Sequence, residues 1–192
     1  MRLSNGLASF VVVGVMASGA LAHEVVYVAS LDGPSEAPPN ASPGTGFSTV
    51  TIDLDLLTMR VEVDYGGLLG TVTAAHIHGP TTDPGTGTAG VMTPLPSFPG
   101  FPHGTTAGTY DATFDLTLAS AYNAGFITAS GGTISDAMNR MLLALEDGKA
   151  YLNIHSSMFP GGEIRGFYRL VPAPGAMVML GMGGLLAARR RR

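Results

Sequence analysis

The chain has 192 residues and a formal net charge of −4 at pH 7, with 27 glycines, 13 prolines and no cysteine. Without cysteine it can form neither a disulfide nor a thiolate site for metal binding or catalysis. Residues 23–170 hold 14 acidic and five basic residues, a net charge of −9, which excludes nucleic acid and anionic lipid as partners because these need clustered Lys and Arg.

The first 22 residues show the three parts of a secretory signal peptide. Arg2 is followed by an apolar run over residues 7–15 and then by the small residues Ala20 and Ala22, which predict cleavage after Ala22. The apolar run is shorter than the roughly 20 residues needed to span a bilayer. The mature chain is then expected to begin at His23, whose free amino group and imidazole form one candidate pair of copper ligands.

Short segments of alternating apolar and polar residues follow at regular spacing. Such alternation indicates strands with one buried and one solvated face, which is typical of antiparallel sheets. The predicted strands are Glu24–Leu31, Phe47–Asp55, Arg60–Tyr65, Thr71–His78, Tyr110–Leu116 and two strands within Lys149–Leu170, joined by Pro160, Gly161 and Gly162. The pattern predicts an all-β fold: an antiparallel β-sandwich or barrel, Ig-like or superoxide-dismutase-like, with one short helix.

The helix is predicted over Ser135–Asp147. Its apolar residues recur at helical spacing, Ser135 can cap the start and Gly148 can end it. The apolar face, which we interpret as core packing, consists of Met138, Met141, Leu142 and Leu145.

A loop rich in Gly and Pro is predicted over Gly79–Gly108, with Phe98, Phe101 and His103 inside it. Long loops in compact domains are often functional or mobile. We expect mainly a solvent-exposed connection, with room for a short strand around Gly90–Leu95.

The candidate metal ligands are histidines. His76 and His78 lie two residues apart on one predicted strand, so their side chains share a face about 7 Å apart. If His155 comes from a neighbouring strand, three imidazoles can converge on one ion, with His103 or water as a fourth ligand. Neutral imidazole suits copper and zinc. The alternative is structural: His76 and His155 are partly buried and hydrogen-bond each other, Asn153, Thr or backbone groups, which pins the strands together.

The last predicted strand, Glu163–Leu170, is expected to turn Ile164, Tyr168 and Leu170 inward. Glu163 and Arg165 share the other face at i and i+2, and we interpret them as a surface or rim salt bridge. No Ser-His-Asp or paired-carboxylate arrangement can be assembled from the sequence, so a catalytic role is not predicted.

Three segments together resemble the CHRD domain, a module found in secreted proteins. They are LDGPSEAPPNASPGTG at residues 31–46, HIHGP at residues 76–80 and YLNIHSSMFPGGEIRGFY at residues 151–168. The resemblance covers about residues 24–170 and predicts one domain over residues 23–170. It implies an extracellular β-sandwich or barrel and says little about biochemical activity.

The C-terminal residues 171–192 resemble a PEP-CTERM sorting signal, although Ala173 stands where that signal usually has Glu. The motif at residues 171–175 precedes an apolar run at 176–188 and an Arg cluster at 189–192; its key residues are Val171, Pro172, Pro174, Gly175, Arg189 and Arg190. The resemblance implies recognition and removal of the tail by an exosortase-type enzyme, after transient membrane association. The alternative is a retained membrane anchor with its Arg cluster in the cytoplasm.

These observations favour an exported, non-enzymatic β domain at the cell surface, in the outer envelope or in the exopolysaccharide matrix of a Gram-negative bacterium. Its expected partner is a protein, a glycan or an ion. The alternative is a copper- or zinc-binding metalloprotein with a His-rich site, which either holds the metal or performs redox chemistry.

The two processing predictions can be tested by intact-mass measurement on protein from the native envelope and medium. We expect a chain that begins at His23 and lacks the C-terminal tail. A retained tail on protein from the membrane fraction would instead identify residues 171–192 as an anchor.

Overall fold

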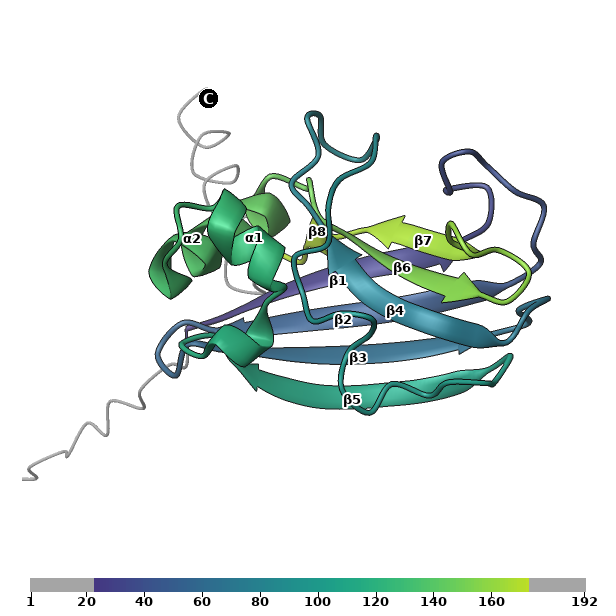
Figure 1. The fold of residues 1–192 in the computed structure, drawn as a ribbon, viewed down its shortest axis with the longest axis horizontal. Helices are drawn as coiled ribbons and strands as arrows, with labels where there is room; N and C mark the ends of the chain where they lie inside the picture. Colours follow the sequence, from purple (N-terminus) through teal and green to yellow (C-terminus); the bar gives the residue numbers. More distant parts are fainter. Residues whose placement is uncertain (1–22, 173–192) are drawn as a thin grey trace, which may run out of the picture.

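The computed structural model describes residues 23–172, so the predicted signal peptide and residues 173–192 lie outside it (Figure 1). One antiparallel sheet forms the body of the domain, in the order β4-β6-β7-β1-β2-β3-β5, and a short β8 pairs with β1. The strands are β1 (Glu24–Asp32), β2 (Thr45–Asp53), β3 (Thr58–Gly66), β4 (Val72–His78), β5 (Gly108–Asp115), β6 (Tyr151–Ser156), β7 (Ile164–Phe167) and β8 (Arg169–Leu170). The all-β expectation is confirmed.

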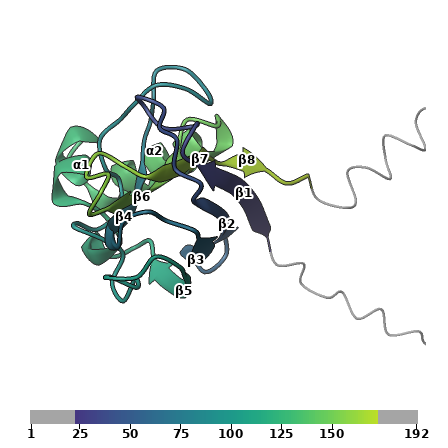
Figure 2. The same ribbon diagram turned by 90° about the vertical axis from the view of Figure 1, so that its right-hand side faces the viewer.

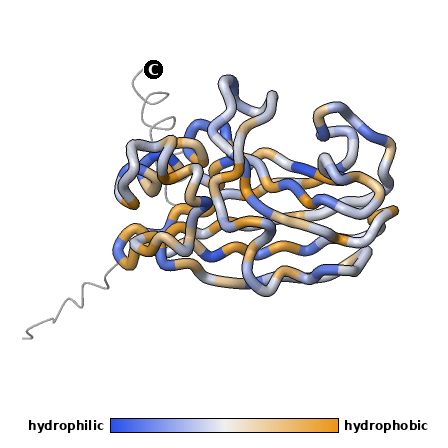
Figure 3. Tube along the Cα trace, viewed as in Figure 1, coloured by the Kyte–Doolittle hydropathy of each residue, from blue (hydrophilic) through white to orange (hydrophobic). Residues whose placement is uncertain are grey.

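The sheet curls into a half-barrel, with its strands around a common interior (Figure 2). The two end strands of the sheet are β4 and β5. Alternating residues of each strand enter that interior, and Figure 3 shows the corresponding alternation of apolar and polar residues. In β3, for example, the exposed residues alternate with the buried Met59, Val61, Val63 and Tyr65. Burial of one apolar face therefore fixes the pairing of β1, β2, β3 and β5.

The predicted exposed loop after β4 is in fact part of the core. Phe98 and Phe101 are buried, and Phe98 packs against Tyr110 and Phe114 of β5 with ring centroids 5.7 and 5.6 Å apart. The loop also pairs with the free edge of β4, since the Met92 N–H donates to the Ile77 carbonyl at 2.8 Å. Residues 82–88 of the loop are exposed as expected, but the expectation was wrong for the segment with Met92, Phe98 and Phe101, because that segment closes the gap between the two ends of the sheet.

The backbone of this loop forms little regular structure. The short strand that was allowed around Gly90–Leu95 is reduced to a single bridge between His78 and Val91. Side chains replace much of the missing ladder: Thr93 and Ser97 accept hydrogen bonds from the backbone N–H groups of Ile77 and Ala75, both at 2.9 Å. The edge of β4 is thus covered and not free to pair with another chain.

The predicted helix is α2 (Ile134–Glu146), which packs at one end of the sheet (Figure 1). Met141 and Leu145 are buried, as expected. Its N-cap is Thr133 and not the predicted Ser135: the Thr133 side chain accepts a hydrogen bond from the Asp136 N–H. Gly148 follows the end of the helix, as predicted, with a φ of 66°. A 3-10 turn η1 (Ala119–Ala121) and a short α1 (Ala124–Ala129) precede it; neither was predicted. Among residues 23–172, no helix is long and apolar enough to cross a membrane.

Glu163 is fully buried, which contradicts the predicted surface salt bridge with Arg165. Its carboxylate accepts hydrogen bonds from the Ser42 hydroxyl at 2.6 Å and from the N–H groups of Leu69 and Gly70 at 2.5 and 3.2 Å. Burial alone would raise the pKa of this carboxyl, but these hydrogen bonds and one from Ser156 outweigh it and lower the pKa below its usual value. Glu163 therefore ties two loops to the start of β7.

Arg165 is also buried, and its ionic partner is Glu36, at 3.8 Å, in place of Glu163. Its guanidinium donates to the carbonyls of Ser35 and Gly87. Beyond Arg165 the predicted last strand is split: Tyr168 is buried, but Leu170, which was expected to face inward, is half exposed.

Replacing Glu163 with Ala should destabilise the fold by about 3 kcal/mol or more, because three buried donors lose their acceptor. Urea unfolding measures this, with Glu24→Gln as control, because Glu24 is exposed. Since the pKa of Glu163 is lowered from 4.5 on folding, its stabilisation is present above pH 4.5 and is lost as the pH falls through the folded pKa. A cost that is small at pH 7, or that does not shrink in acid, would contradict this account of Glu163.

Candidate metal centre

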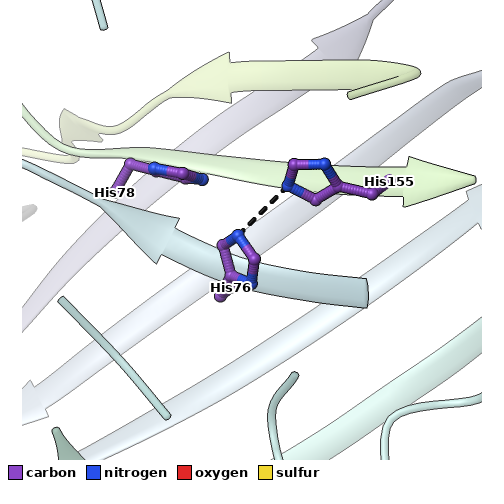
Figure 4. Close-up of side chains that lie close together, drawn as sticks. All are labelled: His76, His78 and His155. Carbon is purple, nitrogen blue, oxygen red and sulfur yellow. Dashed lines mark hydrogen bonds between the residues drawn. The ribbon is translucent and has the colours of Figure 1, made fainter. Parts of the chain in front are cut away.

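The pairing of β4 with β6 brings the three predicted histidines together. In this register Ala74 lies opposite His155, His76 opposite Asn153 and His78 opposite Tyr151. Ala75 and Ile77, the intervening residues of β4, point into the core. The histidines therefore lie on the face of the sheet opposite these core residues, and Figure 4 shows the three side chains close together over β4 and β6.

The candidate ligand atoms of the three rings all lie within 4.8 Å of one another. His76 is the central ring, with centroids 4.7 Å from His78 and 4.8 Å from His155. The closest approach joins His76 Nε2 and His155 Nε2, which are 3.1 Å apart (Figure 4). The sequence prediction that these three imidazoles can converge is met by the geometry.

Each histidine is held through its other nitrogen by a backbone carbonyl. The acceptors are Pro96 for His76 at 3.0 Å, Ala89 for His78 at 2.8 Å and Pro160 for His155 at 2.9 Å. A carbonyl oxygen can only accept, so each Nδ1 must carry the proton. In the neutral form of all three rings, the lone pair is consequently on Nε2.

The rings stay neutral over a wide pH range. Burial, followed by the charge of neighbouring groups, lowers the pKa of His76 from 6.5 to about 4. Burial likewise lowers the pKa of His78 to about 4, against the hydrogen bond to Ala89, and it lowers the pKa of His155. At neutral pH the three Nε2 atoms therefore present lone pairs and no protons.

The contact between His76 and His155 is consequently not an ordinary hydrogen bond. With both Nδ1 protons donated to carbonyls, neither neutral ring has an Nε2 proton to donate, and two lone pairs face each other at 3.1 Å. His78 Nε2 is buried and has no hydrogen-bond partner in the described part of the chain. The strand-pinning interpretation predicted the contact but does not account for its chemistry.

The arrangement has the features of a metal site. Histidine ligands of metals commonly donate their second ring N–H to a carbonyl, which fixes the tautomer and the ring orientation. With metal–nitrogen bonds of about 2.0–2.1 Å, two ligands of a tetrahedral ion are separated by about 3.3 Å. The observed 3.1 Å between His76 and His155 is close to that value.

Other predicted site residues lie apart from this cluster. His103 is exposed in the loop after β4 and is not part of the group. His23, exposed at the start of the described chain, has its Nδ1 3.3 Å from Asp55. Val171 donates a backbone hydrogen bond to the Val26 carbonyl at 2.8 Å, and Pro172 is exposed at the end of the described chain. The other predicted processing residues lie outside the described residues: Ala20, Ala22, Pro174, Gly175, Arg189 and Arg190.

The sequence analysis allowed for hydrogen bonds from His76 and His155 to backbone groups, but it could not identify the three carbonyls that hold the rings. Pro96 and Ala89 are in the loop after β4, and Pro160 is in the turn after β6. Backbone carbonyls have no residue-type signature, so only the folded positions of these segments could show them. The prolines themselves were visible, but as turn signals.

The fold and the cluster define a small all-β domain with a largely buried histidine site on the face of the sheet opposite the apolar core. The family model of the CHRD domain matches residues 27–168, and the chain therefore belongs to the CHRD domain family. CHRD domains are typical of extracellular proteins. No curated protein and no solved structure matches the chain.

The assigned tautomers can be tested by long-range ¹H–¹⁵N NMR of the metal-free protein. We expect His76, His78 and His155 to be protonated on Nδ1 and unprotonated on Nε2 at pH 7, and His76 and His78 to titrate near pH 4. Because the pKa is lower in the folded than in the unfolded chain, stability should fall as the pH drops from 6.5 towards 4. An Nε2 proton on either His76 or His155 at pH 7 would show an ordinary hydrogen bond and refute the assignment.

Proposed function

We propose that this protein is an exported CHRD-domain protein that binds one copper or zinc ion through the Nε2 atoms of His76, His78 and His155. One observation carries the proposal: all three Nδ1 atoms are committed to backbone carbonyls, while the candidate ligand atoms lie within 4.8 Å of one another. On the sequence alone, binding of a protein or glycan ranked first. The nitrogen geometry supports the metal-binding alternative, and we propose it here for that reason.

A metal ion accounts for the cluster better than a purely structural role does. A structural pair would leave the His76 and His155 lone pairs opposed at 3.1 Å and His78 Nε2 buried without a partner. An unsatisfied buried polar atom costs about 1–3 kcal/mol. A bound cation would satisfy the His76 and His155 nitrogens at once, and His78 would join them as a third ligand after a small shift, because two nitrogens on one ion are at most about 4.2 Å apart and the group spans up to 4.8 Å. Their neutral state means that no proton has to be displaced at pH 7.

The separation of the two closest nitrogens bears on the kind of ion. At bonds of about 2.0–2.1 Å, a separation of 3.1 Å corresponds to a nitrogen–metal–nitrogen angle of roughly 100°. This angle suits tetrahedral zinc and tetragonal copper(II), and it is far from the linear geometry of a two-coordinate ion. Imidazole nitrogen is a good ligand for both metals, and the chain has no cysteine to favour a thiolate site.

The cluster supplies three protein ligands. Among the described residues, the group contains no fourth His or carboxylate. A bound ion would therefore keep a coordination position for water or for an external ligand, as in zinc sites that are not closed by four side chains. The function proposed is metal binding, and no reaction is assigned to it.

The proposed place of action is outside the cytoplasm. Support comes from the CHRD family, which is typical of extracellular proteins, and from the sequences of the two ends of the chain. We propose export through the signal peptide at residues 1–22, sorting by an exosortase-type enzyme through residues 171–192, and residence at the cell surface or in the extracellular matrix. Any protein or polysaccharide partner would meet the domain there.

Isothermal titration with zinc and copper(II), checked by elemental analysis, tests the proposed metal site. We expect one ion per chain for residues 23–172, and at least about 100-fold weaker binding for His76→Gln and His155→Gln, because each loses a direct ligand. Both variants should keep the circular dichroism spectrum of the wild type, since the histidines lie outside the core.

His103→Gln is the matched control, because His103 is exposed and lies outside the cluster. We expect it to bind like the wild type; a clear loss of affinity would instead identify His103 as the fourth ligand. Absence of metal binding by the wild type, or unchanged affinity in His76→Gln and His155→Gln, would refute the proposed function.

A further inference from the structure

Tyr151 packs flat against one of the three histidines. It lies directly opposite His78 in the pairing of β6 with β4. The two ring centroids are 4.8 Å apart and the ring planes differ by only 2°. Tyr151 is 2% exposed, so its ring has little freedom to turn. The stack therefore restricts the plane in which the His78 imidazole can lie.

A single residue of the loop connects both rings. The Ala89 carbonyl accepts the hydrogen bond from His78 Nδ1 at 2.8 Å, and the Ala89 N–H donates to the Tyr151 hydroxyl at 3.3 Å. His78, Tyr151 and Ala89 thus each contact the other two. Ala89 therefore contacts both rings, while the direct restraint on the His78 ring is the stack with Tyr151.

Tyr151 is itself held by two neighbours on β7, the buried Arg165 and the half-buried Phe167. The Arg165 guanidinium lies 5.0 Å from the centre of the Tyr151 ring, and the Phe167 ring centroid is also 5.0 Å away. Arg165 donates to the carbonyl of Gly87 at 2.9 Å, two residues before Ala89. The same arginine therefore supports both the tyrosine and the loop segment that it contacts.

The three histidines differ in what places their Nε2 atoms. His76 and His155 already have these atoms 3.1 Å apart, whereas His78 Nε2 has no partner among the described residues. An unpartnered polar atom would turn towards solvent if its ring were free to rotate. The contacts with Tyr151 and Ala89 keep it inside the cluster.

We propose that Tyr151 is the positioning residue that holds His78 as the third ligand and so decides whether the centre has three nitrogen ligands or two. The inference rests on the metal site proposed above. Tyr151 does not touch the ion; it acts through the His78 ring. Its loss converts a three-histidine centre into one formed by His76 and His155 alone.

Pulsed electron paramagnetic resonance of the copper(II)-loaded protein counts the coordinated imidazoles, and titration gives the affinity. We expect three imidazoles in the wild type and two in Tyr151→Leu, with affinity reduced about 10–100-fold, the range seen when a group supporting a metal ligand is removed. Tyr151→Phe keeps the stack and loses only the acceptor for Ala89, so it should retain three imidazoles.

Tyr122→Leu provides the matched control. Tyr122 is also buried, and its hydroxyl donates to the Leu116 carbonyl at 2.8 Å, away from the histidines. We expect this variant to keep three imidazoles and the wild-type affinity. An equal loss in Tyr122→Leu would assign the effect to general destabilisation and overturn the proposal.

The outcomes also separate this inference from the proposed function. Three imidazoles and unchanged affinity in Tyr151→Leu, beside a wild type that binds copper, would overturn the role of Tyr151 alone. A wild type that takes up no metal would overturn the proposed function and this inference together. A change from three imidazoles to two in Tyr151→Leu, with Tyr122→Leu unaffected, is the result that the structure leads us to expect.

Discussion

The antiparallel register of β4 against β6 is the constraint on which the histidine site depends. Ala75 and Ile77 of β4, with Leu152 and Ile154 of β6, are fully buried and fix this register through the core. Side chains alternate along a strand, so a slip of one residue would turn the histidines inward and the apolar residues outward. The same packing that folds this part of the sheet thus holds His76, His78 and His155 on one outer face.

The loops around this pair are part of the same construction. Phe98, buried against β5, anchors the loop that supplies the carbonyls of Ala89 and Pro96. Glu163 is buried just after the turn that contains Pro160. Its hydrogen bonds to Ser42 and Leu69, in two other loops, hold the end of that turn in place. Core contacts therefore place the hydrogen-bond acceptors that set the tautomer of each ring. In this way a sheet without disulfides can hold three imidazoles in a defined arrangement.

The alternation of apolar and polar residues in the sequence predicted the strands and the shared face of His76 and His78, because side chains on a strand have a period of two residues. The helix α2 was predicted from its period of 3.6 residues. Local pattern did not predict that Phe98 and Phe101 are core residues, since a loop rich in Gly and Pro has no periodicity. It misplaced Glu163 and Arg165 because i, i+2 spacing shows a shared face but not whether that face is covered. His155 was a conditional member of the site: its pairing with Ala74 is a long-range contact that only the fold determines.

The central claim is that three Nε2 lone pairs converge to bind one metal ion. Anomalous diffraction at the zinc or copper edge, from crystals grown with that metal, tests it most directly because it locates the ion. The account predicts one anomalous peak, about 2.0–2.1 Å from the Nε2 atoms of His76, His78 and His155, with each Nδ1 still bonded to its carbonyl. A fully loaded crystal with no peak at this position, or with the ion bound elsewhere, would contradict it.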